Sequence, residues 1–203
     1  MLGQIPGRII ALGQRRDDQG FPFREIQVRE EIICAGFGGQ GIMLLGKVIA
    51  QAALKEDKYV TWIPSYGAAM RGGTAFCMVV VSDKEIASPY VDTPDTLFVF
   101  NQPSWDKFKA KVKSKGLALV NSTLVSEKNP PKNIKVASVP FTEMAVSLGN
   151  VRVANMVALG KYLKEKDMFK PKTVFEVFSE IAPKGKKGLI EINRKAIEEG
   201  FNR

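Results

Sequence analysis

The stretch EIICAGFGGQGIMLLGKVIA, residues 31–50, decides the fold of this chain of 203 residues. A short apolar run opens it, a glycine cluster follows at 36–41, and an apolar-rich segment extends from Ile42 to Leu54. In that segment, apolar side chains recur near the helical period of about 3.6 residues. Leu44 and Val48 add apolar side chains on neighbouring faces, which indicates a helix covered on two sides. The stretch therefore predicts a strand, a tight loop and a helix.

Outward from this unit, short apolar runs alternate with amphiphilic segments. The turn Ser82–Lys84 leads towards a short strand near Ile86, which favours a hairpin there. An amphiphilic segment carries Trp105 and Phe108. Further strands are predicted at Tyr59–Ile63, Thr74–Ser82 (the longest), Thr96–Phe100, Leu117–Val120 and Ile134–Val139. The alternation of strands with helices indicates the α/β class.

The last third of the chain has helical patterns. Helices are predicted from about Asn150 to Lys164, from Pro171 onwards, and through Leu189, Ala196 and Ile197. Pro171 suits a first helical turn, and Gly200 suits a helix stop. We predict one α/β domain at 29–203, with a mixed sheet, flanking helices, a Rossmann-like nucleotide-binding topology in its first half and a helical C-terminal third. Residues 1–28 lack a sustained period and are predicted to be an extension, either an arm that packs on a partner or sequence upstream of the domain.

The glycine cluster fits the pattern GxGxxG between a strand and a helix, where backbone amides and the helix dipole can receive an anion. Gly36 and Gly38 would permit close backbone approach, and Gly41 would let the helix pack near the strand. The second strand ends Trp62-Ile63-Pro64-Ser65, without the carboxylate that a dinucleotide site requires, and no Walker lysine follows. A tight connection without any ligand is the competing interpretation.

A second unusual segment, SYGAAMRGG at 65–73, follows the second predicted strand. It is expected at the same end of the sheet as the glycine cluster, and ligands bind at that end in open α/β sheets. Small residues flank Tyr66, Met70 and Arg71, which suits a recognition loop. Alternatively, Arg71 forms an internal ion pair and Tyr66 covers the core.

Composition excludes several functions for this chain. It has no histidine, which excludes a Ser–His triad and any His-ligated metal site. Its two cysteines, Cys34 and Cys77, are too few for an iron–sulfur cluster held by four thiolates, and their apolar surroundings predict buried, reduced thiols. The net charge of +9 favours an anionic partner, but the lysines are dispersed, so a nucleic-acid binder ranks last. Neither a membrane-spanning run nor a secretory signal is recognised, which makes the cytoplasm the expected location.

Both loops, GFGGQG at 36–41 and SYGAAMRGG at 65–73, resemble those of the gamma subunit of 2-oxoacid:ferredoxin oxidoreductases. Asn101-Gln102 after a strand and the segment 150–155 at a late helix support the resemblance, which covers about residues 30–200. It implies an oxygen-sensitive complex that uses thiamine diphosphate to decarboxylate a 2-oxoacid, passes electrons through iron–sulfur clusters to ferredoxin and releases an acyl-coenzyme A.

The resemblance also implies that this chain is not catalytic alone. Alpha and beta subunits, with a delta subunit as a further candidate, would hold thiamine diphosphate and the clusters, so no cofactor is expected in the isolated chain. Coenzyme A is linked with the family's gamma domain, and we carry that over to the two loops. The predicted cofactor contacts are Gly36, Gly38, Gly39, Gln40 and Gly41; the predicted partner or coenzyme A contacts are Ser65, Tyr66, Met70, Arg71, Gly72, Asn101 and Asn155. Asn150 is interpreted as a plain helix N-cap.

The sequence GFGGQG is typical of gamma chains assigned to 2-oxoglutarate enzymes, so 2-oxoglutarate is the favoured substrate, with pyruvate and ketoisovalerate types open. The extension at 1–28 departs from the compact start expected in the family. A free-standing nucleotide- or coenzyme A-binding protein is the alternative function. An isolated subunit would expose an apolar patch that self-pairing would hide, so a homodimer of the isolated chain is also open.

Overall fold

The computed structural model describes residues 28–65, 75–181 and 187–203. The strands in this part are β1 (Arg29–Gly36), β2 (Tyr59–Ser65), β3 (Ala75–Ser82), β4 (Thr96–Val99), β5 (Leu117–Asn121) and β6 (Lys135–Val139). The α-helices are α1 (Ile42–Lys55), α2 (Gln102–Phe108), α3 (Phe141–Ser147), α4 (Ala154–Lys166), α5 (Pro171–Ile181) and α6 (Lys187–Phe201), and the short 3₁₀ helices are η2 (Lys109–Lys111) and η3 (Val151–Val153). The predicted extension 1–28 lies outside the described residues except for Val28.

The six strands form one mixed sheet in the order β2-β3-β1-β4-β5-β6. The pairs β1–β4, β4–β5 and β5–β6 are parallel, whereas β3 is antiparallel to both β1 and β2. The predicted α/β class with a mixed sheet is therefore confirmed. The strand order differs from the Rossmann-like order expected for the first half, because β3 lies between β1 and β2.

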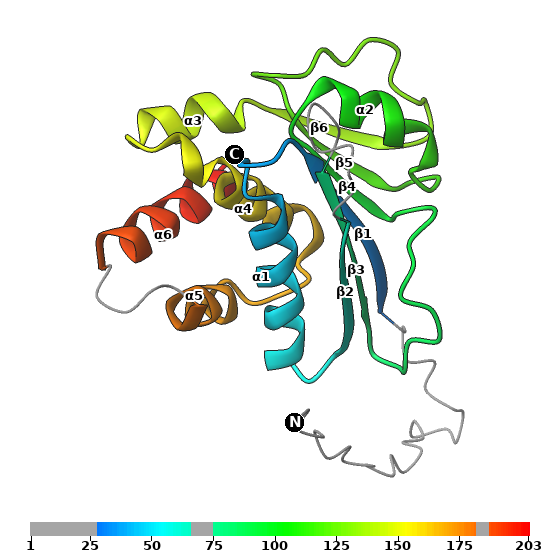
Figure 1. Cartoon of the computed structure of the whole chain (residues 1–203), viewed down its shortest axis with the longest axis horizontal. Coiled ribbons are helices and arrows are strands. Elements are labelled where there is room, and N and C mark those ends of the chain that lie inside the picture. Colours follow the sequence, from blue (N-terminus) through cyan, green and yellow to red (C-terminus); the bar gives the residue numbers. More distant parts are fainter. Residues whose placement is uncertain (1–27, 66–74, 182–186) are drawn as a thin grey trace, which may run out of the picture.

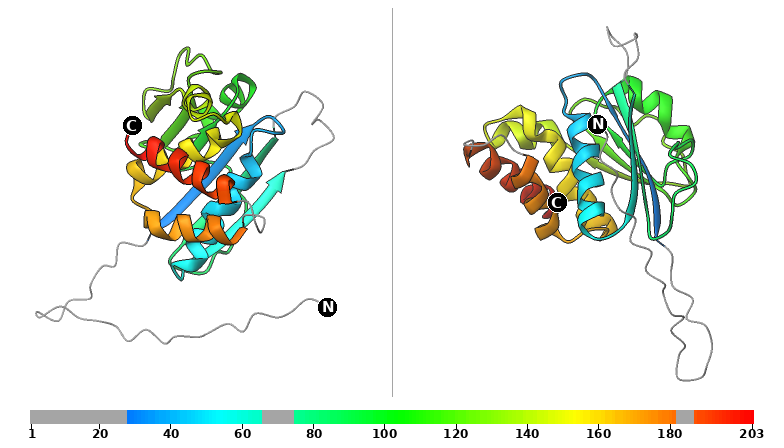
Figure 2. Two further views of the ribbon diagram at one scale, coloured as in Figure 1. Left: turned by 90° about the vertical axis from the view of Figure 1, so that its left-hand side faces the viewer. Right: turned by 60° about the horizontal axis from the view of Figure 1, so that its bottom comes forward.

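Both faces of the sheet are covered by helices (Figure 1). Along β1, Ile32 and Cys34 join the core beneath α1, α3 and α4, while Ile33 and Ala35 join the core beneath α2. Helices α5 and α6 lie outside α1 and α4, which thickens the helical layer on that side (Figure 2). Burial on both faces explains why β1 is a continuous apolar run rather than an alternating one.

Helix α1 is enclosed on two sides, as its sequence predicts. It packs on β2 and β3 with one side and against α5 and α4 with another. Gly46 allows the close approach to the sheet, because a Cβ there would lie 2.5 Å from the Sγ of Cys77. Leu44 and Leu54 remain exposed at opposite ends of the helix.

Two expectations were wrong. No strand forms near Ile86, so the predicted hairpin is absent: β3 already has β1 on one side and β2 on the other, which leaves no free edge. The strand predicted as the longest, Thr74–Ser82, is β3; its described part has eight residues, as many as β1, and Thr74 lies outside the described residues. Gly200 does not stop a helix but lies inside α6, which ends at Phe201. Helix α3 was not predicted.

Within residues 28–65, 75–181 and 187–203, no helix is both long and apolar enough to cross a membrane.

Candidate functional site

The glycine loop, residues 36–41, joins β1 to α1. Its left-handed positions are Gly39, with φ of +90°, and Gly41, with φ of +73°. Side chains rarely adopt such angles, so these two positions need glycine for backbone reasons. The sequence predicted that Gly36 and Gly38 permit close backbone approach; the positive φ angles of the loop lie at Gly39 and Gly41.

Gln40 closes this loop. Its Oε1 accepts a hydrogen bond from the backbone N–H of Phe37 at 2.6 Å, and its Nε2 donates to the carbonyl of Phe100 at 3.1 Å. A Cβ on Gly36 would lie 2.6 Å from Gln40 Oε1, so a small residue at 36 is needed for the side chain at 40 to fold inward. The two hydrogen bonds of Gln40 thereby hold the end of β1 beside the end of β4.

The C-terminal end of the loop is held by α4. Asn155 Nδ2 donates to the carbonyl of Gly41 at 3.0 Å, and a Cβ on Gly41 would lie 2.3 Å from that nitrogen. The sequence predicted that Gly41 lets the helix pack near the strand. The structure shows instead that the close contact at Gly41 is with Asn155 on α4. Asn155 is 1% exposed, and its Oδ1 has no hydrogen-bond partner among the described residues.

Asparagines follow the ends of two parallel strands. Asn101, after β4, accepts the backbone N–H of Ser104 at 2.8 Å and caps α2; its Nδ2 has no partner in the described part of the chain. Asn121 closes β5, donates to Thr142 Oγ1 at 2.8 Å and accepts the N–H of Thr142 at 3.2 Å. The sequence analysis did not identify Asn121. The signal was present, because Asn121 is the last residue of a buried strand and Asn101 comes just after another. The prediction for Asn150 agrees with the structure, since its Oδ1 accepts the N–H of Arg152 at 3.0 Å.

The chain turns to opposite faces after the neighbouring strands β1 and β4. Helix α1 follows β1 onto one face, and α2 follows β4 onto the other (Figure 1). In open α/β sheets, ligands bind in the crevice where such a switch occurs. Gln40 spans this point, which places the glycine loop and the loop after β4 in one candidate site.

The electrostatics at the start of α1 favour an anion. Among the described residues no side chain caps this helix end, and the first turn of α1 holds no acidic residue. The first amides of a helix lack internal partners and carry the positive end of the dipole. A phosphate or carboxylate from a ligand or partner would therefore be stabilised there.

Two hollows flank the glycine loop. The first, of 300 Å³, is lined chiefly by Phe37, Gly38, Met43, Leu44 and Ala75. The second, of 130 Å³, is lined by Gly39 and Gln40 of the loop and extends to α3 and η3. Gly39 lines both.

The second predicted loop is anchored at the same end of the sheet. Ser65 ends β2 and pairs with Phe76, and Ala75 at the start of β3 pairs with Gly36. Ser65 is half-buried. The other predicted contacts in this loop, Tyr66, Met70, Arg71 and Gly72, lie outside the described residues.

The two thiols lie beneath the loops. Cys34 and Cys77 are register partners on β1 and β3, both fully buried and both free. Burial raises the pKa of the Cys34 thiol well above its ordinary value. In the described residues, no group of three His, Cys, Asp or Glu side chains could hold a metal ion.

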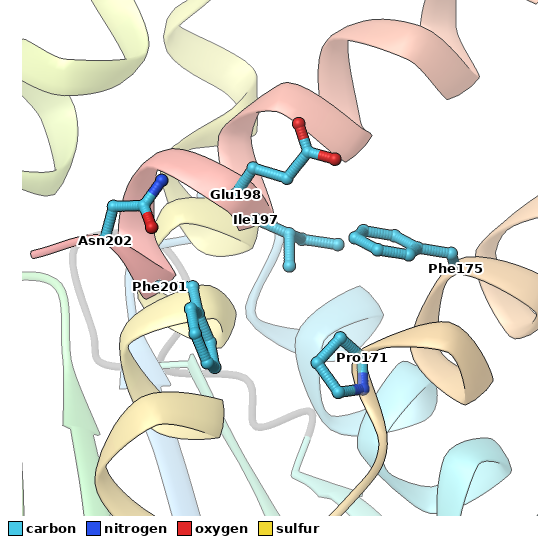
Figure 3. Close-up of a pocket in the computed structure, with 6 residues that line it drawn as sticks. All are labelled: Pro171, Phe175, Ile197, Glu198, Phe201 and Asn202. Atoms are coloured by element: carbon cyan, nitrogen blue, oxygen red, sulfur yellow. The ribbon is translucent and has the colours of Figure 1, made fainter.

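A separate groove lies between α5 and α6, far along the chain from the glycine loop (Figure 3). It measures 230 Å³, and Phe175, Ile197 and Phe201 make its walls largely apolar. Its acidic member, Glu198, is paired with Arg194 at 2.9 Å. The side-chain amide of Asn202 is the other polar group on its lining.

Comparison with known proteins gives a consistent result. A family model described as pyruvate ferredoxin/flavodoxin oxidoreductase matches residues 31–203. The ketoisovalerate oxidoreductase subunit VorA of Methanothermobacter marburgensis is 40% identical over 184 residues, which covers 88% of this chain and 36% of VorA. This chain thus spans about a third of the length of that relative.

Two further proteins match over nearly their whole length. The 2-oxoglutarate synthase subunit KorC of Methanocaldococcus jannaschii is 35% identical over 181 residues, covering 88% of this chain and 95% of KorC. A crystal structure of the keto/oxoacid ferredoxin oxidoreductase gamma subunit from Geobacter sulfurreducens superposes with a TM-score of 0.74 at 31% identity, covering 85% of this chain and 96% of that one.

Proposed function

The chain belongs to the pyruvate ferredoxin/flavodoxin oxidoreductase family, and from this premise we propose that it is the gamma subunit of a 2-oxoacid:ferredoxin oxidoreductase. The observation that carries the proposal is the match to separate subunits of the same extent. KorC and the Geobacter gamma subunit are covered at 95% and 96% of their length. In VorA the same unit is part of a longer chain.

In the proposed complex, a 2-oxoacid loses carbon dioxide, its electrons pass to ferredoxin, and the acyl group leaves as a coenzyme A thioester. Bound thiamine diphosphate would supply the carbanion chemistry, and we assign it to the alpha and beta subunits. The iron–sulfur clusters also belong to partner chains in this proposal, because two buried cysteines cannot supply the four thiolates of a cluster. The role of this chain is assembly and contact with coenzyme A.

The coenzyme A contact is assigned to the glycine loop. Three observations support it: the uncapped start of α1, the switch of chain direction between β1 and β4, and the hollow of 300 Å³ beside Phe37. A phosphate of the ligand would meet the first amides of α1. Gln40, Gly41 and Asn155 would act by holding the loop, since their side-chain and backbone hydrogen bonds join parts of this chain to one another.

We further propose that Arg71, in the loop 65–73, binds a partner carboxylate or a coenzyme A phosphate. Arg71→Ala is expected to raise the KM for coenzyme A or to weaken assembly. Unchanged coenzyme A kinetics together with unchanged assembly would rule this role out.

The favoured substrate is 2-oxoglutarate, supported by the loop sequence GFGGQG and by the similarity to KorC. The similarity to VorA makes ketoisovalerate the main competitor, and pyruvate is the third candidate. The partner subunits are expected to form most of the substrate pocket.

The test is to co-express the chain with candidate alpha and beta subunits, purify the product without oxygen and measure reduction of a viologen and of ferredoxin. Each of the three 2-oxoacids is offered with coenzyme A. A complex active with 2-oxoglutarate would support the full proposal, and a preference for another 2-oxoacid would reassign the substrate alone. A lone chain that binds coenzyme A or a nucleotide and recovers no partner would favour the free-standing binding protein.

A further inference from the structure

The groove between α5 and α6 continues beyond the hollow of 230 Å³ into an adjoining hollow of 150 Å³. Phe175 and Ile197 line both hollows, and their side chains point toward each other from the two helices (Figure 3). Each hollow is smaller than the volume of about 300–1,000 Å³ that is usual for small-molecule sites. The groove therefore suits the side chains of a polypeptide rather than a cofactor. We call it the α5–α6 groove.

Aromatic side chains leave apolar surface uncovered along this groove. Phe201 on its wall is 39% exposed, and Phe175 is only half-buried. A single exposed apolar residue is ordinary, but aromatic side chains around a concave surface are typical of an interaction site. Among the described residues, nothing covers this surface.

The rim of the groove is acidic compared with the rest of the chain. Glu191 and Glu198 line it, together with one base, Arg194. Helices α5 and α6 carry five acidic and four basic residues, whereas the whole chain has 21 acidic and 30 basic residues. Glu198 pairs with Arg194 and Glu191 with Lys195, but these side chains are roughly half exposed. Exposed ion pairs contribute little to stability, so both carboxylates can accept other cations.

The first sixteen residues of the chain have the complementary chemistry. Their sequence, MLGQIPGRIIALGQRR, contains the apolar run Ile9–Leu12 between Arg8 and the pair Arg15-Arg16. It contains no acidic residue. An apolar run flanked by arginines fits an apolar groove whose rim carries carboxylates. These residues lie outside the described part of the chain.

The described chain begins at the same end of the molecule as α5. The N–H of Val28 donates to Asp83 Oδ2 at 2.9 Å, and Asp83 also pairs with Lys58 at 2.7 Å, just after α1. At that end of α1, Glu56 accepts the N–H of Lys170 at 3.0 Å, immediately before α5 begins. The eleven residues between the basic segment and Val28 can span about 36 Å when extended, which is enough to reach the start of the groove.

A segment of the same chain needs only a modest affinity for the groove. Tethering gives it an effective concentration in about the millimolar range. The segment is also extra to the family unit. The family model begins at residue 31, and the match to KorC covers 95% of KorC but 88% of this chain. The groove thus has a candidate occupant that is always present beside it.

We propose that residues 5–16 bind in the α5–α6 groove of their own chain. The apolar run Ile9–Leu12 occupies the two hollows, and the flanking arginines lie beside Glu191 and Glu198. The N-terminal extension then covers the outer helices of the domain. This role does not depend on the proposed function.

The experiment places a photoreactive side chain in the segment of the full-length chain. p-Benzoylphenylalanine replaces Ile10, the purified protein is irradiated in dilute solution, and peptide mass spectrometry maps the cross-links. We expect an internal cross-link from position 10 to α5 or α6. The matched control carries the same group at Phe21, in the same extension but outside the proposed segment, and should not mark the groove.

Variants of the groove and of the segment test the contact itself. Phe201→Asp in the groove wall should lower the yield of the internal cross-link by about fivefold or more. Val146→Asp on α3, where the side chain is 58% exposed and outside the groove lining, is the control and should leave the yield unchanged. Arg15→Glu combined with Arg16→Glu should also lower the yield, and adding Glu198→Arg should restore part of it. Circular dichroism confirms that each variant is folded.

Three results would overturn the inference. The first is a position-10 group that marks neither α5 nor α6, or that marks them equally in the wild type and all variants. The second is a cross-link between two chains, which would assign the groove to the extension of a second copy. The third is a cross-link to a co-expressed alpha or beta subunit in place of the internal one. None of these results decides whether the chain is a gamma subunit, so the proposed function is tested separately.

Discussion

Glu30 and Glu31 are adjacent on β1 and point to opposite faces of the sheet. Glu30 is buried, accepts a hydrogen bond from Thr96 Oγ1 at 2.5 Å and pairs with Lys166 at 3.1 Å; burial raises the pKa of Glu30 above 4.5. Burial also acts on Glu31, but hydrogen bonds and charges from Lys113 and Arg29 outweigh it and hold the pKa of Glu31 below 4.5. The same strand thus carries two carboxyl groups shifted in opposite directions.

These shifts predict opposite effects of pH on stability. Glu31 binds protons more weakly in the folded chain, so its contribution is present above pH 4.5 and is lost as the pH falls through its lowered pKa. Glu30 binds protons more tightly in the folded chain, so its contribution is greatest below pH 4.5 and declines as the pH rises through its raised pKa. The free energy of unfolding can be measured with urea across about pH 3–7. In Glu31→Gln it should fall less toward acid pH than in wild type. In Glu30→Gln it should decline less as the pH rises above 4.5. Equal changes in both variants would contradict this assignment.

Gln40 gives a second test at this scale. Gln40→Ala removes the hydrogen bonds to Phe37 and Phe100, and we expect a loss of about 1–2 kcal/mol in the free energy of unfolding. Gln51→Ala, at a half-exposed position of α1, is the control and should change stability by less than about 0.5 kcal/mol. Denaturant midpoints measure both. An unaffected Gln40→Ala would mean that the loop closes without this side chain.

The sequence identified Gln40, Gly41 and Asn155 as candidate site residues but not how they act. The contact between Gly41 and Asn155 joins positions 114 residues apart, and a single sequence does not show which distant residues pair. The motif predicts a tight turn. Which side chain lies beside Gly41 depends on how α4 packs.

At the scale of elements, α4 and α6 cross at a pair of glycines. A Cβ on Gly160 would lie 2.0 Å from the carbonyl oxygen of Ile197, and one on Gly200 would lie 1.9 Å from that of Val157. The two backbones are therefore in direct contact at this crossing. Gly200 is needed for that approach, which explains why it lies inside a helix despite its low helical propensity.

Alanine at either crossing glycine should force the helices apart. We expect Gly160→Ala and Gly200→Ala to destabilise the chain by about 1–3 kcal/mol. The matched control is Gly188→Ala in the same helix as Gly200, where no atom lies within 4 Å of the new Cβ, and it should be neutral or stabilising by about 0.5–1 kcal/mol. Thermal unfolding of the three variants distinguishes the sites. A destabilised Gly188→Ala would instead indicate a general sensitivity of α6.

Elements with strong apolar patterns were predicted well: β1, α1, β4, β5 and β6 all lie where the sequence indicated. Helix α3 was missed because it has only seven residues, too few for a helical period to stand out. The strand near Ile86 failed for another reason. Ile86 packs on the core beneath α2, but a strand needs a free neighbouring edge, and topology had already used both edges of β3.

Across the whole molecule, the cysteine pair is shielded by the sheet on which it lies and by α1. Cys34 and Cys77 are both fully buried, so a reagent in solution cannot reach either thiol in the folded chain, and neither should react. We expect a thiol reagent such as a nitrobenzoate disulfide to titrate neither cysteine under native conditions and both after denaturation. Rapid reaction of either thiol in the native chain would show that the sheet opens locally.

The central position of β1 has a consequence for amide hydrogen exchange. This strand is hydrogen-bonded to β3 on one side and to β4 on the other, and both of its faces are buried. Its amides should exchange only through the largest opening reactions of the molecule. Beyond Phe37, whose N–H is bonded to Gln40, Gly38 and Gly39 are exposed and should exchange far faster. Protection would then fall sharply between Ala35 and Gly38, so the tip of the loop can adjust to a partner while its attachment point stays fixed.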